Sequence, residues 1–169
     1  MIVSILILAA VTLERLAELI LARHNTAQLL ARGAVEHAAG HYPMIVLLHA
    51  FWLAGLWLLA WNRQVEWGWL GLFALLQLLR AWTLITLGGR WTTRIIVLPG
   101  EVLVRRGPYR FFSHPNYLVV VGEIAILPLA FGLTWFAAVF TLLNAGVLWV
   151  RISAENAALA RLTDAPRRA

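Results

Sequence analysis

The chain has 169 residues, of which 62% are hydrophobic and 13% are charged, about half the charged share that is usual in soluble domains. This composition excludes a soluble domain, and the length leaves no room for a separate soluble catalytic domain. The absence of cysteine excludes disulfides and thiolate metal sites. The net charge of +6 comes from arginine alone. Such an excess is typical of the cytoplasmic loops of membrane proteins, so we expect neither a metal nor a nucleic-acid partner.

The apolar segments predict an all-α integral membrane protein, a single domain over 1–169 with five transmembrane helices. A spanning helix needs about 20 mostly apolar residues, and the candidates are about 1–22, 43–61 and 66–88, followed by two helices within 116–150. The first segment lacks a positively charged start, so we interpret it as a retained span and not as a signal peptide. The last segment is too long for one helix, and Pro128 and Phe131-Gly132 mark the bend of a helical hairpin.

The distribution of arginine predicts the orientation. With five spans, the segments 23–42, 89–115 and 151–169 share one side and contain eleven arginines, whereas the other side contains only Arg63. Basic residues mark cytoplasmic loops, so we expect the N-terminus outside and the C-terminus in the cytoplasm. Tryptophans are typical of membrane interfaces, and we expect Trp61, Trp67 and Trp69 at the outer interface and Trp91 and Trp149 at the inner one.

Glu14, Arg80 and Glu123 are ionisable residues within predicted spans. A charge near the middle of a bilayer costs about 2.5–3.5 kcal/mol on insertion scales. We therefore expect a polar face of Gln77, Arg80 and Thr83 to meet Glu14 or Glu123 inside the bundle. Such a contact could be a buried ion pair, or it could form the wall of a substrate tunnel.

The segment 89–115 is the long stretch between the predicted spans, and it mixes short β-like apolar runs with Pro-Gly and Gly-Pro turns. A long structured loop in a compact domain is usually functional. Asn144, Arg151 and Glu155 lie at positions i, i+7 and i+11, so a continued fifth helix carries them on one stripe. Pro115 suits the first turn of the fourth helix. We expect the loop and these helix ends to converge on one side of the membrane.

Each polar residue of this group has a simpler explanation when it is taken alone. His114 could cap the fourth helix, and Tyr109 and Tyr117 could be interfacial aromatics. Arg151 and Glu155 could form an exposed i,i+4 pair worth only about 0.3–0.5 kcal/mol. Under either interpretation we expect lipid head groups to be contacted by Arg105, Arg106 and Arg110.

The pattern LVRRGPYRFFSHPNY, followed 34 residues after Tyr117 by RISAE, resembles the isoprenylcysteine carboxyl methyltransferase family and its bacterial relatives. The likeness covers about residues 90–160, and the spacing of Gly-x-Tyr, His-Pro-x-Tyr and Arg-x-x-x-Glu is fairly specific. It implies a cytoplasmic cradle for S-adenosylmethionine, which leaves as S-adenosylhomocysteine. By position, the cradle consists of Arg94, Glu101, Val102, Leu103, Val104, Tyr109, His114, Pro115, Asn116, Tyr117 and Glu155.

The same resemblance implies an O-methyltransferase for a lipophilic substrate, with Arg151, His114 and Glu155 as the catalytic residues. Arg151 would orient a carboxylate acceptor, and His114 or Glu155 would accept the proton of a phenol or enol. The spans within 1–88 precede the segment 89–169, which contains the cofactor-binding loop, the hairpin and the C-terminal helix. The chain departs from the family pattern at Arg94, where glutamine is usual, and at Ser113, Val119 and Asn156.

Within this family the likeness is greatest to a bacterial branch associated with alkylpyrone- or alkylresorcinol-type lipids, which places the protein in a bacterial cytoplasmic membrane. Its expected partners are membrane lipids and a lipophilic small molecule, without an obligatory protein partner. Two other functions stay open. One is a phospholipid-type N-methyltransferase, in which acidic residues and not Arg151 would contact the substrate. The other is a non-enzymatic membrane carrier or assembly protein, which would not bind S-adenosylhomocysteine.

Overall fold

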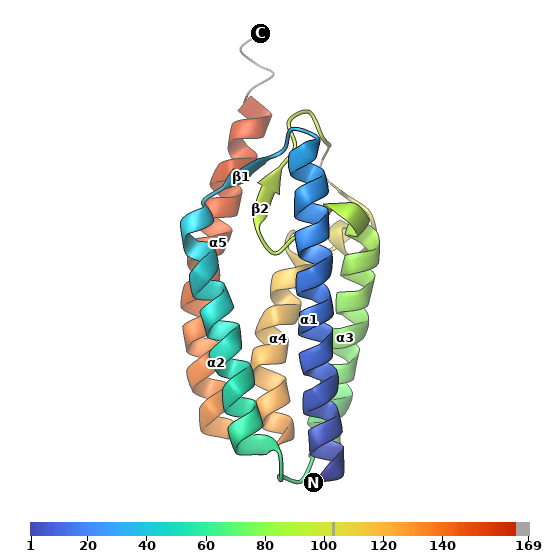
Figure 1. The fold of residues 1–169 in the computed structure, drawn as a ribbon, viewed down its shortest axis with the longest axis vertical. Coiled ribbons are helices and arrows are strands. Elements are labelled where there is room, and N and C mark those ends of the chain that lie inside the picture. Colours follow the sequence, from blue (N-terminus) through green and yellow to red (C-terminus); the bar gives the residue numbers. More distant parts are fainter. Residues whose placement is uncertain (103, 165–169) are drawn as a thin grey trace.

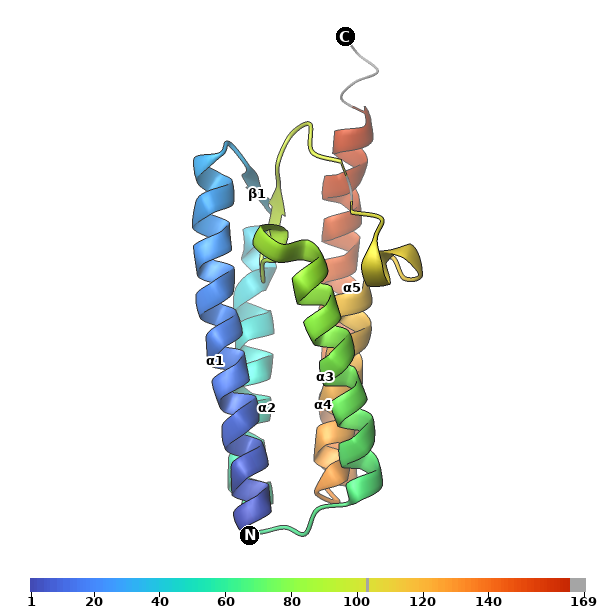
Figure 2. The same cartoon turned by 90° about the vertical axis from the view of Figure 1, so that its right-hand side faces the viewer.

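The computed structural model describes residues 1–102 and 104–164, and most of these are helical. Its five long helices are α1 (Ile2–Ala31), α2 (Tyr42–Ala60), α3 (Trp67–Leu87), α4 (Pro115–Ala130) and α5 (Thr134–Asp164), which run side by side (Figure 1). Three short 3-10 helices connect them, η1 (Ala39–His41), η2 (Gly88–Arg90) and η3 (Gly107–Arg110). The predicted all-α architecture is therefore confirmed. The N-terminus and the α2–α3 connection lie at one end, and α5 extends beyond the other end (Figure 2).

Helix α1 is longer than predicted. The prediction ended it near residue 22, where the apolar stretch ends, but the structure continues it to Ala31. The residues from Arg23 to Leu30 include neither glycine nor proline, so nothing in the backbone stops the helix when it leaves the apolar stretch. Gly33, with a φ of 87°, follows its end. The end of an apolar stretch is thus not the end of the helix.

The C-terminal hairpin bends where the sequence predicts. Helix α4 begins at Pro115 in its first turn, and the chain turns after Ala130 at Phe131 and Gly132. Gly132 adopts a φ of 70°, a conformation that glycine reaches without steric cost. Helix α5 then continues past residue 150, as the stripe of Asn144, Arg151 and Glu155 requires.

Two short strands tie the loops together at one end of the bundle. Strand β2 (Ile95–Val97) lies in the predicted loop, and it pairs antiparallel with β1 (Val35–His37), with Val35 opposite Val97. We did not predict β1, because three residues are too few to show an alternating pattern. The side chain of Asn25 on α1 donates to the carbonyl of Trp91 over 2.8 Å. This end of α1 is therefore attached directly to the loop.

The outer surface of the bundle is strongly apolar. Leu58, Ile85 and Leu142 are each at least 75% exposed, which is expected for side chains that face lipid. Helices α2 and α5, and α3 together with η2, are long and apolar enough to cross a membrane, whereas α4 is apolar but shorter. The protein is thus a helical membrane protein, and the number of five spans stays a prediction.

The tryptophans agree with their predicted positions in part. Trp61, Trp67, Trp69 and Trp149 are exposed, as interfacial side chains should be. Trp91, which we expected at the inner interface, is instead only 3% exposed. The indole ring of Trp91 therefore lies inside the protein, whereas its level relative to the membrane interface stays a prediction.

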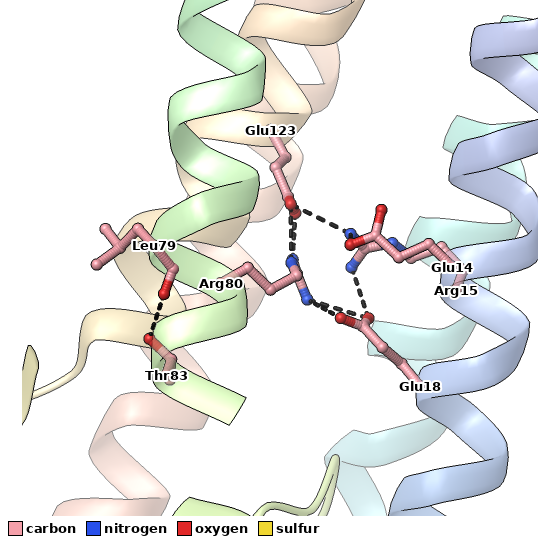
Figure 3. Close-up of polar contacts among 7 residues, drawn as sticks. All are labelled: Glu14, Arg15, Glu18, Leu79, Arg80, Thr83 and Glu123. Carbon is pink, nitrogen blue, oxygen red and sulfur yellow. Dashed lines mark hydrogen bonds and ion pairs between the residues drawn. The ribbon is translucent and has the colours of Figure 1, made fainter. Parts of the chain in front are cut away.

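A buried cluster of charged side chains joins three helices (Figure 3). Arg80 on α3 forms hydrogen bonds with Glu123 on α4 and, over 2.9 Å, with Glu18 on α1. Arg15 lies 2.9 Å from Glu18 and 3.1 Å from Glu123. The expected contact between Arg80 and Glu123 is confirmed. Glu18 takes the place predicted for Glu14, which is one helical turn earlier and lies beside Arg15 at 3.4 Å.

The other members of the predicted polar face do not join this cluster. Thr83 donates to the carbonyl of Leu79 in its own helix over 2.8 Å (Figure 3), and the buried amide of Gln77 has no hydrogen-bond partner among the described residues. The cluster is therefore an ion-pair network between Arg15, Glu18, Arg80 and Glu123. In lipid the hydrophobic effect does not hold helices to one another, so these polar contacts link α1 to α3 and α4.

Candidate active site

A cavity of about 480 Å³ lies between the 89–115 segment, the start of α4 and the C-terminal part of α5, which we predict to be cytoplasmic. Its volume falls within the range of about 300–1,000 Å³ that is usual for small-molecule sites. The strand β2 provides one wall, and Tyr109 of η3, Tyr117 of α4 and Arg151 of α5 face it from other elements. The cavity thus lies where the loop and the helix ends were expected to converge.

Most of the predicted site residues line this one cavity. The lining includes Arg94, Glu101, Val102, Val104, Tyr109, His114, Asn116, Tyr117, Arg151 and Glu155. Pro115 is buried as the first residue of α4 and does not belong to the lining. Leu103 lies outside the described residues. The structure therefore brings the set together, while the role of each residue stays a prediction.

The hydroxyl of Tyr117 connects the two residues of the Arg-x-x-x-Glu motif. Arg151 donates from Nε to the hydroxyl oxygen over 2.8 Å, and the hydroxyl in turn donates to the carboxylate of Glu155. The guanidinium group of Arg151 also lies 5.5 Å from the centre of the Tyr117 ring. Arg151 and Glu155 are thus held through a shared partner and do not form the simple exposed ion pair that their spacing allows. Tyr117 is also not an exposed aromatic at the membrane interface, because it is only 9% exposed.

Two further contacts fix this group. Nη1 of Arg151 donates to the backbone carbonyl of Thr93 over 2.8 Å, which connects α5 to the residues before β2. The ring of His114 stacks on that of Tyr117 with centres 5.2 Å apart, and its Nδ1 lies 3.9 Å from the Glu155 carboxylate. His114 forms no side-chain hydrogen bond that caps α4. Its orientation is therefore set by Tyr117 and Glu155.

Two of the predicted cradle residues, Arg94 and Glu101, have partners that the sequence did not indicate. Arg94 donates to the carboxylate of Glu36 on β1 over 2.9 Å, and its guanidinium lies 4.7 Å from the ring centre of Tyr42. Glu101 pairs with Arg90 over 2.8 Å. Both side chains thus stabilise the wall of the cavity. Glu36 and Tyr42 carry no motif. The pairing of β1 with β2 brings Glu36 to the site, and Tyr42 reaches it from the start of α2.

Two buried polar atoms in the lining have no hydrogen-bond partner among the described residues. They are Nε1 of Trp91, a donor, and Oδ1 of Asn116, an acceptor. Buried polar atoms are rarely left unpaired, so these two are candidates for ligand contacts. Sequence reasoning found Asn116 through its motif and missed Trp91, which it assigned to the membrane interface.

Electrostatics keep the phenol of Tyr109 neutral. Burial, together with the smaller effect of the nearby charge of Glu155, raises the pKa of Tyr109 to about 12. A neutral phenol donates a hydrogen bond and does not add a negative charge to the cavity. At physiological pH the described acidic groups of the lining are therefore Glu101 and Glu155.

The chain is similar in sequence to known proteins. The sequence model of the isoprenylcysteine carboxyl methyltransferase (ICMT) family matches residues 69–161, which include every residue of the cavity lining except Leu29. A Bacillus subtilis (strain 168) protein, "Uncharacterized protein YpbQ", is 39% identical over 159 residues, which cover 91% of this chain and 95% of that protein. No solved structure matches the chain significantly.

Proposed function

The chain belongs to the isoprenylcysteine carboxyl methyltransferase family of integral membrane proteins, and from that premise we propose that it transfers a methyl group from S-adenosylmethionine to an oxygen of a lipophilic substrate. The observation that carries this proposal is the Tyr117 hydroxyl, which joins Arg151 and Glu155 at the cavity. We place the cavity on the cytoplasmic side because of the arginine-rich segments around it.

The residues of the cavity fit the proposed cofactor. S-adenosylmethionine carries a positively charged sulfonium, amine and hydroxyl donors, and an adenine ring. Glu155 and the free Oδ1 of Asn116 offer acceptors, and the free Nε1 of Trp91 offers a donor. We propose that Tyr109, His114 and the 101–104 segment complete the cradle. When bound, the cofactor supplies an electrophilic methyl group to the acceptor oxygen.

Arg151 is the proposed contact for the methyl acceptor. Its Nε and Nη1 are fixed by Tyr117 and Thr93, whereas its Nη2 has no hydrogen bond with a described residue. Two fixed bonds orient the third nitrogen, which can therefore bind a substrate oxygen at a defined position. Correct positioning of the acceptor relative to the methyl group can lower the activation free energy by about 7–11 kcal/mol.

His114 is the proposed proton acceptor for a phenol or enol substrate, whereas a carboxylate substrate needs none. Glu155 already accepts the hydrogen bond of Tyr117, which makes it less available as a base. At 3.9 Å from the His114 Nδ1, the Glu155 carboxylate would stabilise the imidazolium that forms. The apolar part of the substrate would remain among the lipids that cover the helices.

Calorimetric titration with S-adenosylhomocysteine in detergent tests cofactor binding, and methyl transfer from labelled cofactor tests the reaction. We expect saturable binding and a preference for carboxylate or phenol lipids over matched amine lipids. Arg151→Ala and Glu155→Ala should abolish transfer, whereas Arg63→Ala and Glu66→Ala, at exposed positions of the opposite end, should not change it. If the product does not bind, the protein is no methyltransferase. If amines are preferred, the N-methyltransferase alternative replaces this proposal.

A further inference from the structure

A second cavity, of about 470 Å³, lies beside the first at the end of α3. Its polar lining consists of Thr86 and three arginines, Arg90, Arg105 and Arg106, and no described residue of the lining is acidic. Both cavities are lined by Leu87, Arg90, Val102, Val104 and Arg105. The two cavities therefore share a wall, and the second one has a positive lining.

The arginines of this second cavity differ in their partners. Arg90 is already paired, because it donates to the carbonyl of Val102 over 2.9 Å and lies 2.8 Å from the carboxylate of Glu101. Arg105 and Arg106 form no ion pair or hydrogen bond with any other described side chain. Both residues are exposed, so their positive charges are available to an anion that enters the cavity.

Local structure fixes the place of Arg105 and Arg106. They precede Gly107, which adopts a φ of 58° and packs so closely against Thr86 that a Cβ atom would overlap its hydroxyl. This contact attaches the start of η3 to the last turn of α3. The two arginines therefore lie in the irregular segment directly before this contact, beside the end of α3.

Exposed apolar side chains surround the same segment. Phe111 is 67% exposed, Phe112 is 48% exposed and Val102 is 80% exposed, and η3 lies level with the end of α3 (Figure 2). Aromatic side chains next to arginines are typical of the membrane interface. A small soluble anion would not account for these exposed apolar groups, whereas an amphiphile would cover them.

We propose that the second cavity binds the phosphate of an anionic phospholipid, with Arg105 and Arg106 as its ligands and with Phe111 and Phe112 against its acyl chains. Guanidinium groups match the geometry of phosphate oxygens and are the preferred side chains for such contacts. Arg110 belongs to the same basic segment but does not line the cavity, so it should contribute only general attraction to the membrane. The site does not depend on the proposed methyl transfer.

Native mass spectrometry of the full chain tests this proposal. The protein is released from neutral detergent in the presence of equal amounts of phosphatidylglycerol and phosphatidylcholine with identical acyl chains. We expect phosphatidylglycerol to be retained at least tenfold more, and the double variant Arg105→Gln/Arg106→Gln to lose this preference. The matched control, Arg23→Gln/Arg110→Gln, removes the same charge from exposed positions that do not line the cavity and should keep this preference.

Three results would overturn the proposal. Equal retention of the two lipids would show that the cavity does not select an anion. An equal loss in both double variants would show diffuse attraction to the basic surface. Competition by inorganic phosphate as strong as that by phosphatidylglycerol would identify a free-anion site without a lipid contribution. The single variant Arg106→Gln, at an exposed position, repeats the test in case the double variant does not fold.

Discussion

Arg151 on α5 and Tyr117 on α4 are joined by a 2.8 Å hydrogen bond across the C-terminal hairpin, although they are 34 residues apart in sequence. The same hydroxyl binds Glu155 one helical turn further along α5. One oxygen atom thereby determines how two charged side chains face the cavity. The proposed chemistry consequently depends on the packing of α4 against α5 as much as on the motif itself.

Replacing Tyr117 by phenylalanine tests this shared oxygen. Tyr117→Phe keeps the ring that stacks on His114 but removes hydrogen bonds to two charged groups, each worth about 1.5–3 kcal/mol. We expect kcat/KM for methyl transfer to fall roughly ten- to hundredfold while the protein remains folded. Arg63→Ala, at an exposed position of the opposite end of the bundle, is the control. Full activity of Tyr117→Phe would show that the hydroxyl has no part in the reaction.

The buried ion-pair network should contribute to stability. Among the described residues, Arg80→Leu leaves Glu18 and Glu123 with Arg15 as their only cation, and removing one partner of a buried pair costs about 3–5 kcal/mol. We expect a clearly lower thermal unfolding midpoint in detergent. The double variant Arg80→Leu/Glu123→Leu should recover part of the loss, because Arg15 and Glu18 remain paired at 2.9 Å. A single variant as stable as the exposed Arg23→Leu would contradict this role.

Gly107 should not tolerate a side chain. In Gly107→Ala the residue would have to keep a left-handed conformation, which costs about 1–2 kcal/mol, and its Cβ would also overlap Thr86. We expect reduced stability and weaker retention of phosphatidylglycerol, because η3 would move away from α3. Gly89→Ala adds a Cβ where no atom lies within 4 Å, so it should behave like the wild type. Denaturation in detergent compares the two variants.

Tyr109 should make stability depend on pH in the alkaline range. Its pKa is about 10 in the unfolded chain and about 12 in the fold. Below pH 10 the phenol is therefore neutral in both states, and it does not change how stability depends on pH. Above pH 10 only the unfolded chain loses the proton, and stability should fall until about pH 12. Tyr109→Phe should weaken this fall. Identical pH profiles of the wild type and the variant would contradict the burial of the phenol.

Three features could be predicted from local sequence patterns: the membrane class, the hairpin bend at Phe131-Gly132 and the stripe of Asn144, Arg151 and Glu155. These features depend on the length of apolar stretches, on backbone breakers and on the helical period, which act over a few residues. The family resemblance could also be recognised from the sequence, because its motifs lie at fixed spacings along the chain.

Contacts between side chains that are distant in sequence could not be predicted and depend on how the helices pack. The tertiary structure selected Glu18 and not Glu14 for Arg80, brought β1 to β2, and buried Trp91. Each of these contacts joins residues that are distant in sequence, and each depends on how far one helix is rotated and shifted against another. Apolar periodicity in a membrane helix does not set that rotation, because lipid and protein interior are similarly apolar, so the polar contacts between helices must set it.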